Sequence, residues 1–308
     1  MASDRFGLYS ASFTHAGGTL DLQQLREQSV NTNSRFKIIR PGGGLNPAAH
    51  ILSTANPTKR FYTSDLVTAL TTIDIASGLA CSGGSVMRYQ KRTPGGAFAT
   101  GGSHLTQTTP KGFLHITGIS VDIDSEDGAE AELEYVALSS DGTNPVTNTE
   151  SVNFAAAPVP AFMSQYYLGG QWLDSTQVES LVALRVNPGI VFQARRVDGG
   201  VFPRYGASSI VARNPQKTMS YLNAALGSQM GSLFANALGA TVKSLLQRAT
   251  TSADGRLAMA STNHIRIDVA AGTWGHEDIR ASGENDAVTN VTVRPTGTLS
   301  VALGVASP

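Results

Sequence analysis

The stretch RFKIIRPGGGLNP, residues 35–47, decides the interpretation of the chain, because a related stretch, VFQARRVDGGVFP, follows at residues 191–203. Both stretches place a phenylalanine, an arginine, a glycine pair and a proline at the same spacing. The matched pairs are Phe36 and Phe192, Arg40 and Arg196, Gly43 and Gly199, Gly44 and Gly200, and Pro47 and Pro203. A repeat of this kind predicts two copies of one structural unit.

Further matches keep the same order along the chain. They pair Val30-Asn31 with Val186-Asn187, Gln90 with Gln247, His104 with His264, Gly112 with Gly272, and SVNFAAAP at 151–158 with SVALGVASP at 300–308. We therefore expect an internal duplication, with similar domains at residues 1–158 and 159–308. The alternative is two unrelated domains of similar composition.

The composition favours a turn-rich β-protein. Of 308 residues, 32 are glycine, 41% are hydrophobic and only 15% are charged, which is below the usual quarter. The single cysteine, Cys81, excludes internal disulfides and cysteine-rich zinc sites, and is expected to be buried. The first ten residues do not resemble a signal peptide, and no apolar run is long enough to span a bilayer, so we expect no membrane partner.

The local patterns predict a mainly β fold with helical insertions, of the α+β class, built from two β-sandwich or barrel domains. Residues 63–73 predict a helix with Thr63 or Ser64 as its N-cap. Residues 215–249 predict a longer helical segment, as one helix or two, from apolar residues at helical steps: Met219, Leu222, Leu226, Met230, Leu233, Leu238, Val242 and Leu245. Alternating segments predict strands near residues 5–13, 34–40, 48–55, 85–92, 103–109, 111–123, 129–138, 151–156, 264–272, 289–295 and 298–305.

No motif in the sequence predicts catalysis. The glycines at 42–44 are not followed by Gly-Lys-Ser/Thr, so Gly43, Gly44, Gly199 and Gly200 are interpreted as structural turns. The stretch DIDSEDG, residues 122–128, lacks the glycine and glutamate positions of an EF-hand and predicts a hairpin turn. His104 and His264 match each other, which favours a shared structural hydrogen bond over metal ligation. We expect no catalytic residue, no cofactor, no metal site and no enzyme activity.

Charge is distributed unevenly between the copies. Glu130, Glu132 and Glu134 alternate and therefore leave one face of a single strand. Residues 1–154 hold 11 Lys/Arg and 14 Asp/Glu, a net charge of −3, and residues 155–308 hold 12 and 9, a net charge of +3. Opposite charges favour attraction between the first copy of one chain and the second copy of the next, although an ordinary solvated surface would show the same pattern.

The organisation resembles the duplicated tail-tube proteins of tailed bacteriophages. The resemblance lies in two tandem β-domains, with TSDLVTAL (63–70) and KTMSYLNAAL (217–226) as helices. The segments YQKRTPGG…SH (89–104) and LQRATTSADG…NH (246–264) would be sheet hairpins. The second helical segment is longer than in a simple tube domain, so the position within the tail stays open.

The resemblance implies a virion structural protein that assembles in the host cytoplasm. Three chains would form a pseudo-hexameric ring, a homo-oligomer that contacts other virion proteins and passes DNA only as non-specific cargo. Glu130, Glu132 and Glu134 are then candidates for the lumen. Two alternatives remain: a double jelly-roll capsid protein that forms pseudo-hexameric trimers, and a carbohydrate-binding or adhesin module. The sequence has only two tryptophans, Trp172 and Trp274, and no aromatic cluster, which disfavours the second alternative.

Overall fold

The computed structural model describes residues 5–23, 25–39, 49–92, 103–124, 128–153, 165–222, 236–250, 255–280, 288–297 and 299–308. The fold is mainly β, as predicted, with several antiparallel sheets and, in the described ranges, one α-helix and one short 3-10 helix. The expected domain boundary near residue 158 lies outside the described residues.

The N-terminal half contains twelve of the named strands and the helix α1. They are β1 (Arg5–His15), β2 (Gly18–Leu22), β3 (Leu25–Asn31), β4 (Arg35–Ile39), β5 (Ala49–Thr54), β6 (Thr58–Thr63), α1 (Leu66–Thr72), β7 (Leu79–Cys81), β8 (Gly84–Arg92), β9 (His104–Thr109), β10 (Lys111–Asp122), β11 (Glu130–Leu138) and β12 (Thr147–Val152).

The C-terminal half contains the other twelve. They are β13 (Tyr166–Leu173), β14 (Thr176–Val178), β15 (Leu181–Asn187), β16 (Ile190–Gln193), η1 (Tyr205–Ala207), β17 (Ser209–Arg213), β18 (Gln216–Tyr221), β19 (Asn236–Ala237), β20 (Val242–Arg248), β21 (His264–Val269), β22 (Gly272–Arg280), β23 (Val288–Pro295) and β24 (Ser300–Val305).

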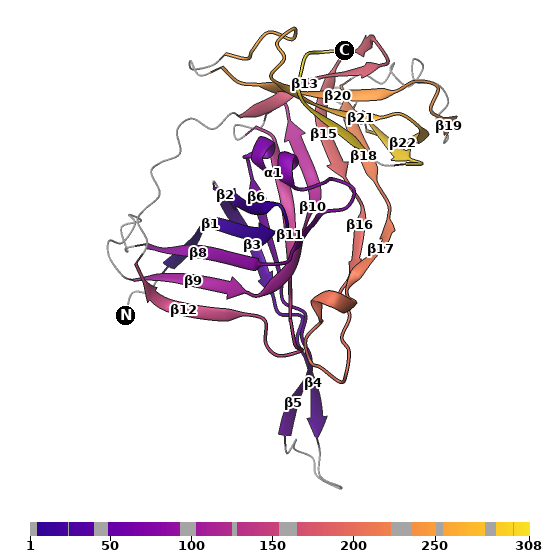
Figure 1. Ribbon diagram of the computed structural model, residues 1–308. Helices are drawn as coiled ribbons and strands as arrows, with labels where there is room; N and C mark the ends of the chain where they lie inside the picture. The colour runs from indigo at the N-terminus through magenta and orange to yellow at the C-terminus, as the bar shows by residue number, and fades with distance from the viewer. Residues whose placement is uncertain are drawn as a thin grey trace.

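The two halves have the same order of strands. The N-terminal half has a five-stranded sheet, β12-β9-β8-β1-β2, and the C-terminal half has the sheet β24-β21-β20-β13-β14. A ten-stranded sheet runs through both halves, with β10-β11-β6-β3 and β22-β23-β18-β15 as equivalent segments, and β7 and β19 pairing with β10 and β22. Each half also has one two-stranded hairpin, β4-β5 or β16-β17 (Figure 1).

Each five-stranded sheet packs on its part of the ten-stranded sheet as a β-sandwich. In the N-terminal half, the ring of Phe13 on β1 lies 6.0 Å from that of Phe61 on β6 and 5.3 Å from that of Tyr135 on β11. In the C-terminal half, Met219 on β18 and Ile267 on β21 are fully buried in the same core. Alternating inward residues of two sheets thus form one continuous hydrophobic core.

Irregularities in strand pairing recur at equivalent positions. The β1–β8 register shifts between Leu8 and Ser10, and the β13–β20 register shifts between Leu168 and Gly170. The β10–β11 pair shifts after Ile116, and the β22–β23 pair shifts after His276. Because a β-bulge re-aims every residue after it, shared bulges keep the same side chains on the same face in both halves.

The predicted helix of the N-terminal half is confirmed, but its cap differs from the prediction. The side chain of Asp65 accepts a hydrogen bond from the Thr68 amide, so Asp65, and neither Thr63 nor Ser64, is the N-cap of α1. The Thr63 hydroxyl instead accepts from the Asp65 amide, one step before the helix. Asp is as good an N-cap as Ser, so residue type alone did not fix the position.

The longer helical segment predicted at 215–249 is wrong where the chain is described. Met219 lies on β18, and Val242 and Leu245 lie on β20, while residues 223–235 fall outside the described ranges. Lys217, Met219 and Tyr221 are buried alternately, which is a strand pattern. Pairing with β15 on one side and β23 on the other overrides the helix propensity of Met and Leu.

The interpretation of the glycines as turns holds for Gly199. Asp198 and Gly199 have φ of 54° and 69°, and the Gly200 amide donates to the Val197 carbonyl at 3.0 Å. Two consecutive residues with positive φ define a tight turn that favours Asp-Gly. Gly43 and Gly44 lie outside the described residues.

Two buried lysines occupy equivalent places in the two sandwiches. Lys59 on β6 donates to the Tyr89 hydroxyl on β8 at 2.7 Å. Lys217 on β18 donates to the carbonyls of Val242 on β20 and Ile267 on β21, at 3.0 and 2.9 Å. Each amine therefore connects the two sheets of its sandwich, and burial lowers the pKa of Lys217 from 10.5 to about 7.

We predict that Lys217 makes the stability of the protein depend on pH. Between pH 7 and about 10 the unfolded chain binds more protons at this group than the folded chain, because the folded pKa is the lower one. Stability from this group should therefore rise with pH across that window. Urea unfolding at pH 7 and pH 9.5 measures the rise, and Lys217→Met should remove most of it. Identical pH profiles for both proteins would contradict the assignment.

Candidate assembly site

The two halves are joined by direct pairing of β10 with β15. Ile119 pairs with Val186 and Asp122 with Ala183 in an antiparallel register. Ile119 and Val186 are both completely buried at this joint. Just beyond the ladder, the Ile123 amide donates to the Val182 carbonyl at 2.8 Å. A backbone ladder with a buried apolar pair fixes the two halves as one continuous sheet.

The joint has a second component, the β16–β17 hairpin of the C-terminal half, which packs on the N-terminal half. The ring of Phe192 stacks on that of Phe113 of β10, with centroids 4.1 Å apart and planes 7° apart. Val136 and Leu138 of β11 complete the buried cluster, with Ile190, Ala194, Tyr205 and Ile210 packed against it. The hairpin therefore covers one end of the exposed face of the sheet that β10 and β11 form.

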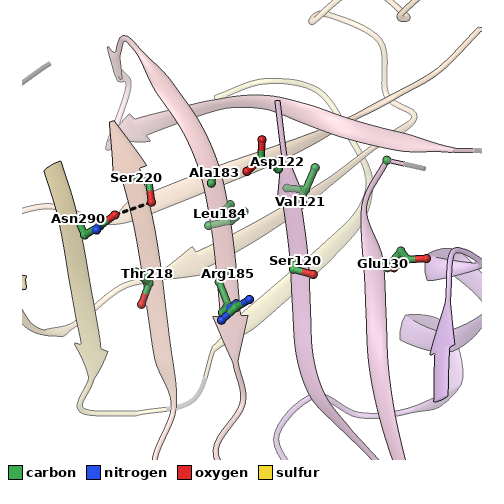
Figure 2. A pocket seen from close by; sticks show the side chains of 11 residues that line it. Ser120, Val121, Asp122, Glu130, Ala183, Leu184, Arg185, Thr218, Ser220 and Asn290 are labelled. Atoms are coloured by element: carbon green, nitrogen blue, oxygen red, sulfur yellow. Dashed lines mark hydrogen bonds between the residues drawn. The ribbon is translucent and has the colours of Figure 1, made fainter. Parts of the chain in front are cut away.

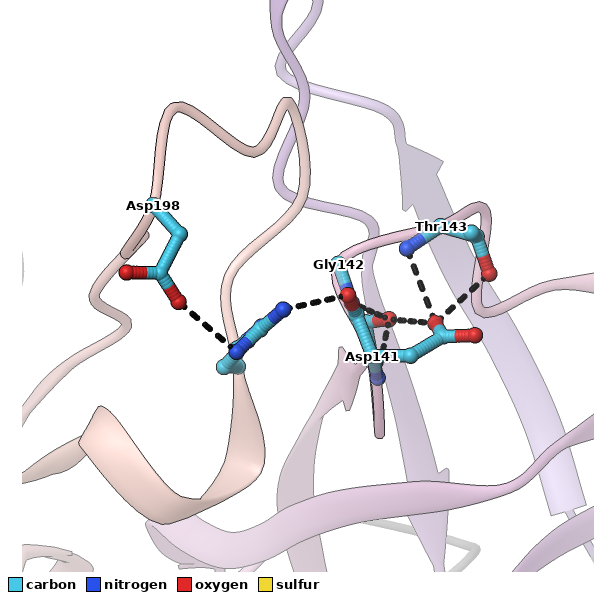
Figure 3. Close-up of polar contacts among 6 residues, drawn as sticks. Asp141, Gly142, Thr143 and Asp198 are labelled. Carbon is cyan, nitrogen blue, oxygen red and sulfur yellow. Dashed lines mark hydrogen bonds and ion pairs between the residues drawn. The ribbon is translucent and has the colours of Figure 1, made fainter.

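Hydrogen bonds and one ion pair of Arg204 order the loop between β16 and β17 and hold it to the N-terminal half (Figure 3). Arg204 donates to the carboxylate of Asp198 at 2.9 Å and to the backbone carbonyl of Asp141 at 2.6 Å. The Asp141 carboxylate accepts from the amide and hydroxyl of Thr143, which lowers its pKa to about 2. The Asp141 turn therefore stays charged and hydrogen-bonded through the mildly acidic range.

The head-to-tail order of the halves leaves two equivalent edges open. In the internal joint, the β10 edge of the first half meets the β15 edge of the second, and the equivalents of these strands are β22 and β3. Within the described residues, β3 ends the sheet on one side, and β22 pairs outward only with the short β19, at Thr273 and Trp274. Both strands therefore present backbone groups that can pair with another chain.

The predicted acidic strand lies on the exposed face of the ten-stranded sheet. Glu130, Glu132 and Glu134 alternate with buried residues on β11, as expected. Two of the three glutamates are ion-paired across the sheet: Glu130 with Arg26 of β3, and Glu134 with Arg60 of β6 at 2.7 Å. The Arg60 pKa is raised by hydrogen bonding and attraction to Glu134. The face is therefore less negative than the glutamates alone predict.

A shallow hollow of about 450 Å³ lies on the same face, across the joint between the halves (Figure 2). Its lining is polar, with Asp122 and Glu130 from the N-terminal half and Arg185, Thr218 and Asn290 from the C-terminal half. Ser220 donates to the Asn290 side chain at 2.6 Å. Thr218 hydrogen-bonds to Thr292 at 2.9 Å, and the lining holds no pairing of nucleophile and base that would indicate catalysis.

The histidines that match in sequence make the same hydrogen bond. Nδ1 of His104 accepts from the Lys91 amide at 3.2 Å, and Nδ1 of His264 accepts from the Arg248 amide at 3.1 Å. The prediction of a shared structural hydrogen bond is confirmed. Across the described part of the chain, no group of three His, Cys, Asp or Glu residues is placed to hold a metal ion.

The remaining sequence predictions concern isolated features. Cys81 is buried, as expected. Residues 122–128 connect β10 to β11, and the described part of this connection has the Asp124 amide donating to the Asp122 carboxylate at 3.0 Å. Within the described ranges, no helix has the length and apolar character that crossing a bilayer requires.

Sequence reasoning missed the contacts that matter most at the joint. Phe113 and Phe192 are apolar residues in short strands, and nothing in their local pattern shows that they stack across the halves. Phe192 was recognised only through its match with Phe36. The repeat was the feature of the sequence that pointed to Phe192, because it marks the two hairpins as equivalent.

No known protein-family model matches this sequence, and no curated protein matches it either.

The two hairpins should respond differently to the same substitution. Phe192→Ala removes the stacked ring, and we expect it to destabilise the isolated chain by about 2–4 kcal/mol. The matched control is Phe36→Ala, because Phe36 is equivalent in sequence but is 59% exposed. That substitution should change stability by less than about 0.5 kcal/mol. Urea unfolding at low protein concentration measures both, and equal losses would contradict the assigned packing.

Proposed function

We propose that this chain is a phage virion structural protein, a tail-tube-like subunit that assembles head to tail into rings through which DNA passes as non-specific cargo. One observation carries the proposal. Within the chain, two halves of equal strand order meet through β10 and β15, and the equivalent edges, β22 and β3, pair with no equivalent partner among the described residues. Repeating the same contact between chains would pair those edges.

The proposal includes an origin for the two halves, namely duplication of one ancestral unit. It rests on the shared strand order, the bulges at equivalent positions and the equivalent hydrogen bonds of His104 and His264. A contact that joins different surfaces of identical units is heterologous, and it closes into a ring when the rotation between units divides a full turn. Three chains would then supply six units, the pseudo-hexameric trimer.

The internal joint also predicts the register of the contact between chains. Since Ile119 pairs with Val186 inside the chain, the equivalent backbone partners are Ile279 of one chain and Val30 of the next. Val30 is 53% exposed, whereas its equivalent, Val186, is fully buried. An exposed valine on an unpaired edge strand is a ready position for strand addition.

The alternatives fit these observations less well. Two jelly rolls in one chain would each close on their own pair of sheets, whereas here one sheet continues through both halves. An adhesin would need an exposed aromatic platform for sugar, but Trp172 and Trp274 are both buried. No arrangement of described side chains favours an enzyme.

The exposed face of the ten-stranded sheet is our candidate for the lumen of the ring. The proposal places the protein in the virion, after assembly in the host cytoplasm. On this face Arg26 and Arg60 are ion-paired with Glu130 and Glu134, which leaves these two cations less available to phosphates. Tight DNA binding needs such cations, because it is driven by release of counterions. A structure of the assembly tests the assignment, and glutamates on the outer wall would contradict it.

We expect Val30→Lys to block ring formation while leaving the folded chain intact. A lysine on an edge strand opposes strand addition, and Val30 is exposed in the single chain. Analytical ultracentrifugation should show wild-type trimers and at least tenfold weaker assembly of the variant. The matched control, Val67→Lys, replaces a 38% exposed valine on α1, outside the edge strands, and should assemble normally.

Negative-stain images of the wild-type protein test the particle type. Rings that stack into tubes support a tail role, whereas flat tiles or closed spheres would support a shell. A chain that stays monomeric at high concentration would overturn the proposal, and rings of six chains would overturn its trimeric form.

A further inference from the structure

We infer that the β4–β5 hairpin of one chain packs on the C-terminal half of a second copy of the chain, over Thr273, Arg294 and Thr296. The inference rests on the proposed ring and adds to it a second contact, separate from the pairing of sheet edges. Its basis is an asymmetry between the two hairpins, one of which is covered within the chain and one of which is not.

The β4–β5 hairpin is apolar but exposed. Phe36, Ile38 and Ile39 of β4 and Ile51 of β5 are between 40% and 59% exposed. Figure 1 shows this hairpin projecting from the end of the molecule, beyond the sandwich. A cluster of large apolar side chains on a projecting arm indicates a binding surface, because water contact with each of them is unfavourable.

The other hairpin shows what such an arm covers. In β16–β17, Phe192 follows a register shift and stacks on Phe113. In β4–β5, Phe36 follows a register shift at the same place, between Arg35 and Phe36. The two phenylalanines are therefore equivalent in sequence and in strand geometry. The covered hairpin, β16–β17, belongs to the C-terminal half and lies on the N-terminal half, its neighbour along the sheet. In a ring, the corresponding neighbour of β4–β5 is the C-terminal half of another chain.

The surface that receives the arm follows from the strand registers. Phe113 pairs with Val136 across β10 and β11, directly after Gly112. The equivalent cross-strand pair is Thr273 with Arg294, next to Gly272 on β22. Phe113 and Val136 are buried under the first arm, whereas Thr273 and Arg294 are exposed in the single chain. The same place on the second unit is therefore open.

The chemistry of the open surface suits a contact between chains. A copy of the Phe113 cluster exposed on an unassembled chain would promote aggregation, and Thr and Arg avoid this. Both still accept an aromatic arm, since the threonine methyl packs on a ring and a guanidinium binds its face. The C-terminal half thus keeps the receiving geometry with a more soluble surface.

Cross-linking tests the contact directly. Phe36→Cys combined with Thr273→Cys places thiols at the positions equivalent to Phe192 and Phe113. Inside the chain, the ring centroids of those two phenylalanines lie 4.1 Å apart. A short bismaleimide added to assembled rings should yield covalent trimers on a denaturing gel. The matched control, Phe192→Cys with Phe113→Cys, should cross-link only within one chain. The native Cys81 does not compete, because it is buried and its pKa is raised to about 12.

The outcomes separate this inference from the proposed ring. Rings without cross-linking between chains at 36 and 273 would overturn the arm contact while the ring proposal stands. A ladder longer than three chains would place the arm on a neighbouring ring and would also overturn it. Covalent trimers from the 36/273 pair, with none from the 113/192 pair, would support it. A protein that forms no rings would overturn both proposals.

Discussion

The antiparallel ladder between β10 and β15 is the interaction on which the rest of the molecule depends. It joins residues far apart in sequence, from Ile119 to Val186, and turns two sandwiches into one continuous sheet. Because the ladder uses different edges of equivalent units, it leaves β3 at the end of the sheet and β22 paired outward only with the short β19, among the described residues. Backbone groups at such edges must meet water or another strand, so the geometry that joins the two halves also leaves edges to which a further strand could be added.

The halves share backbone geometry more closely than surface chemistry. Bulges after Ile116 and His276 keep equivalent residues on equivalent faces, and buried Lys59 and Lys217 each connect two sheets. On the surface, by contrast, the position of Phe113 holds Thr273 in the second half. Backbone irregularities constrain many residues at once, whereas an exposed side chain constrains few. This explains why the two halves share backbone features more than surface side chains.

The sequence predicted strands such as β8, β10 and β21, and the equivalence of His104 and His264, because both depend on local patterns or on direct matching of residue types, but it assigned no strand to β3, β6, β13 or β15. It failed for residues 217–221 and 242–248, where helix-favouring Met and Leu are held in strands by pairing on both sides. The stacking of Phe192 on Phe113 was out of reach, since periodicity carries no information about which distant strand a hairpin will cover. The ion pairs of Glu130 and Glu134 required the same long-range knowledge.

Those ion pairs change what the exposed face of the sheet offers to a polyanion. Three alternating glutamates alone would make a repulsive strip, but Arg26 and Arg60 neutralise two of them, and Ser220 and Asn290 bind each other in the second half. Pairs with one exposed partner contribute little to stability, so their main effect here is on the field. With two of its three glutamates ion-paired, this face would repel phosphates less strongly than three free glutamates, and the two paired arginines are less available to bind a polyanion.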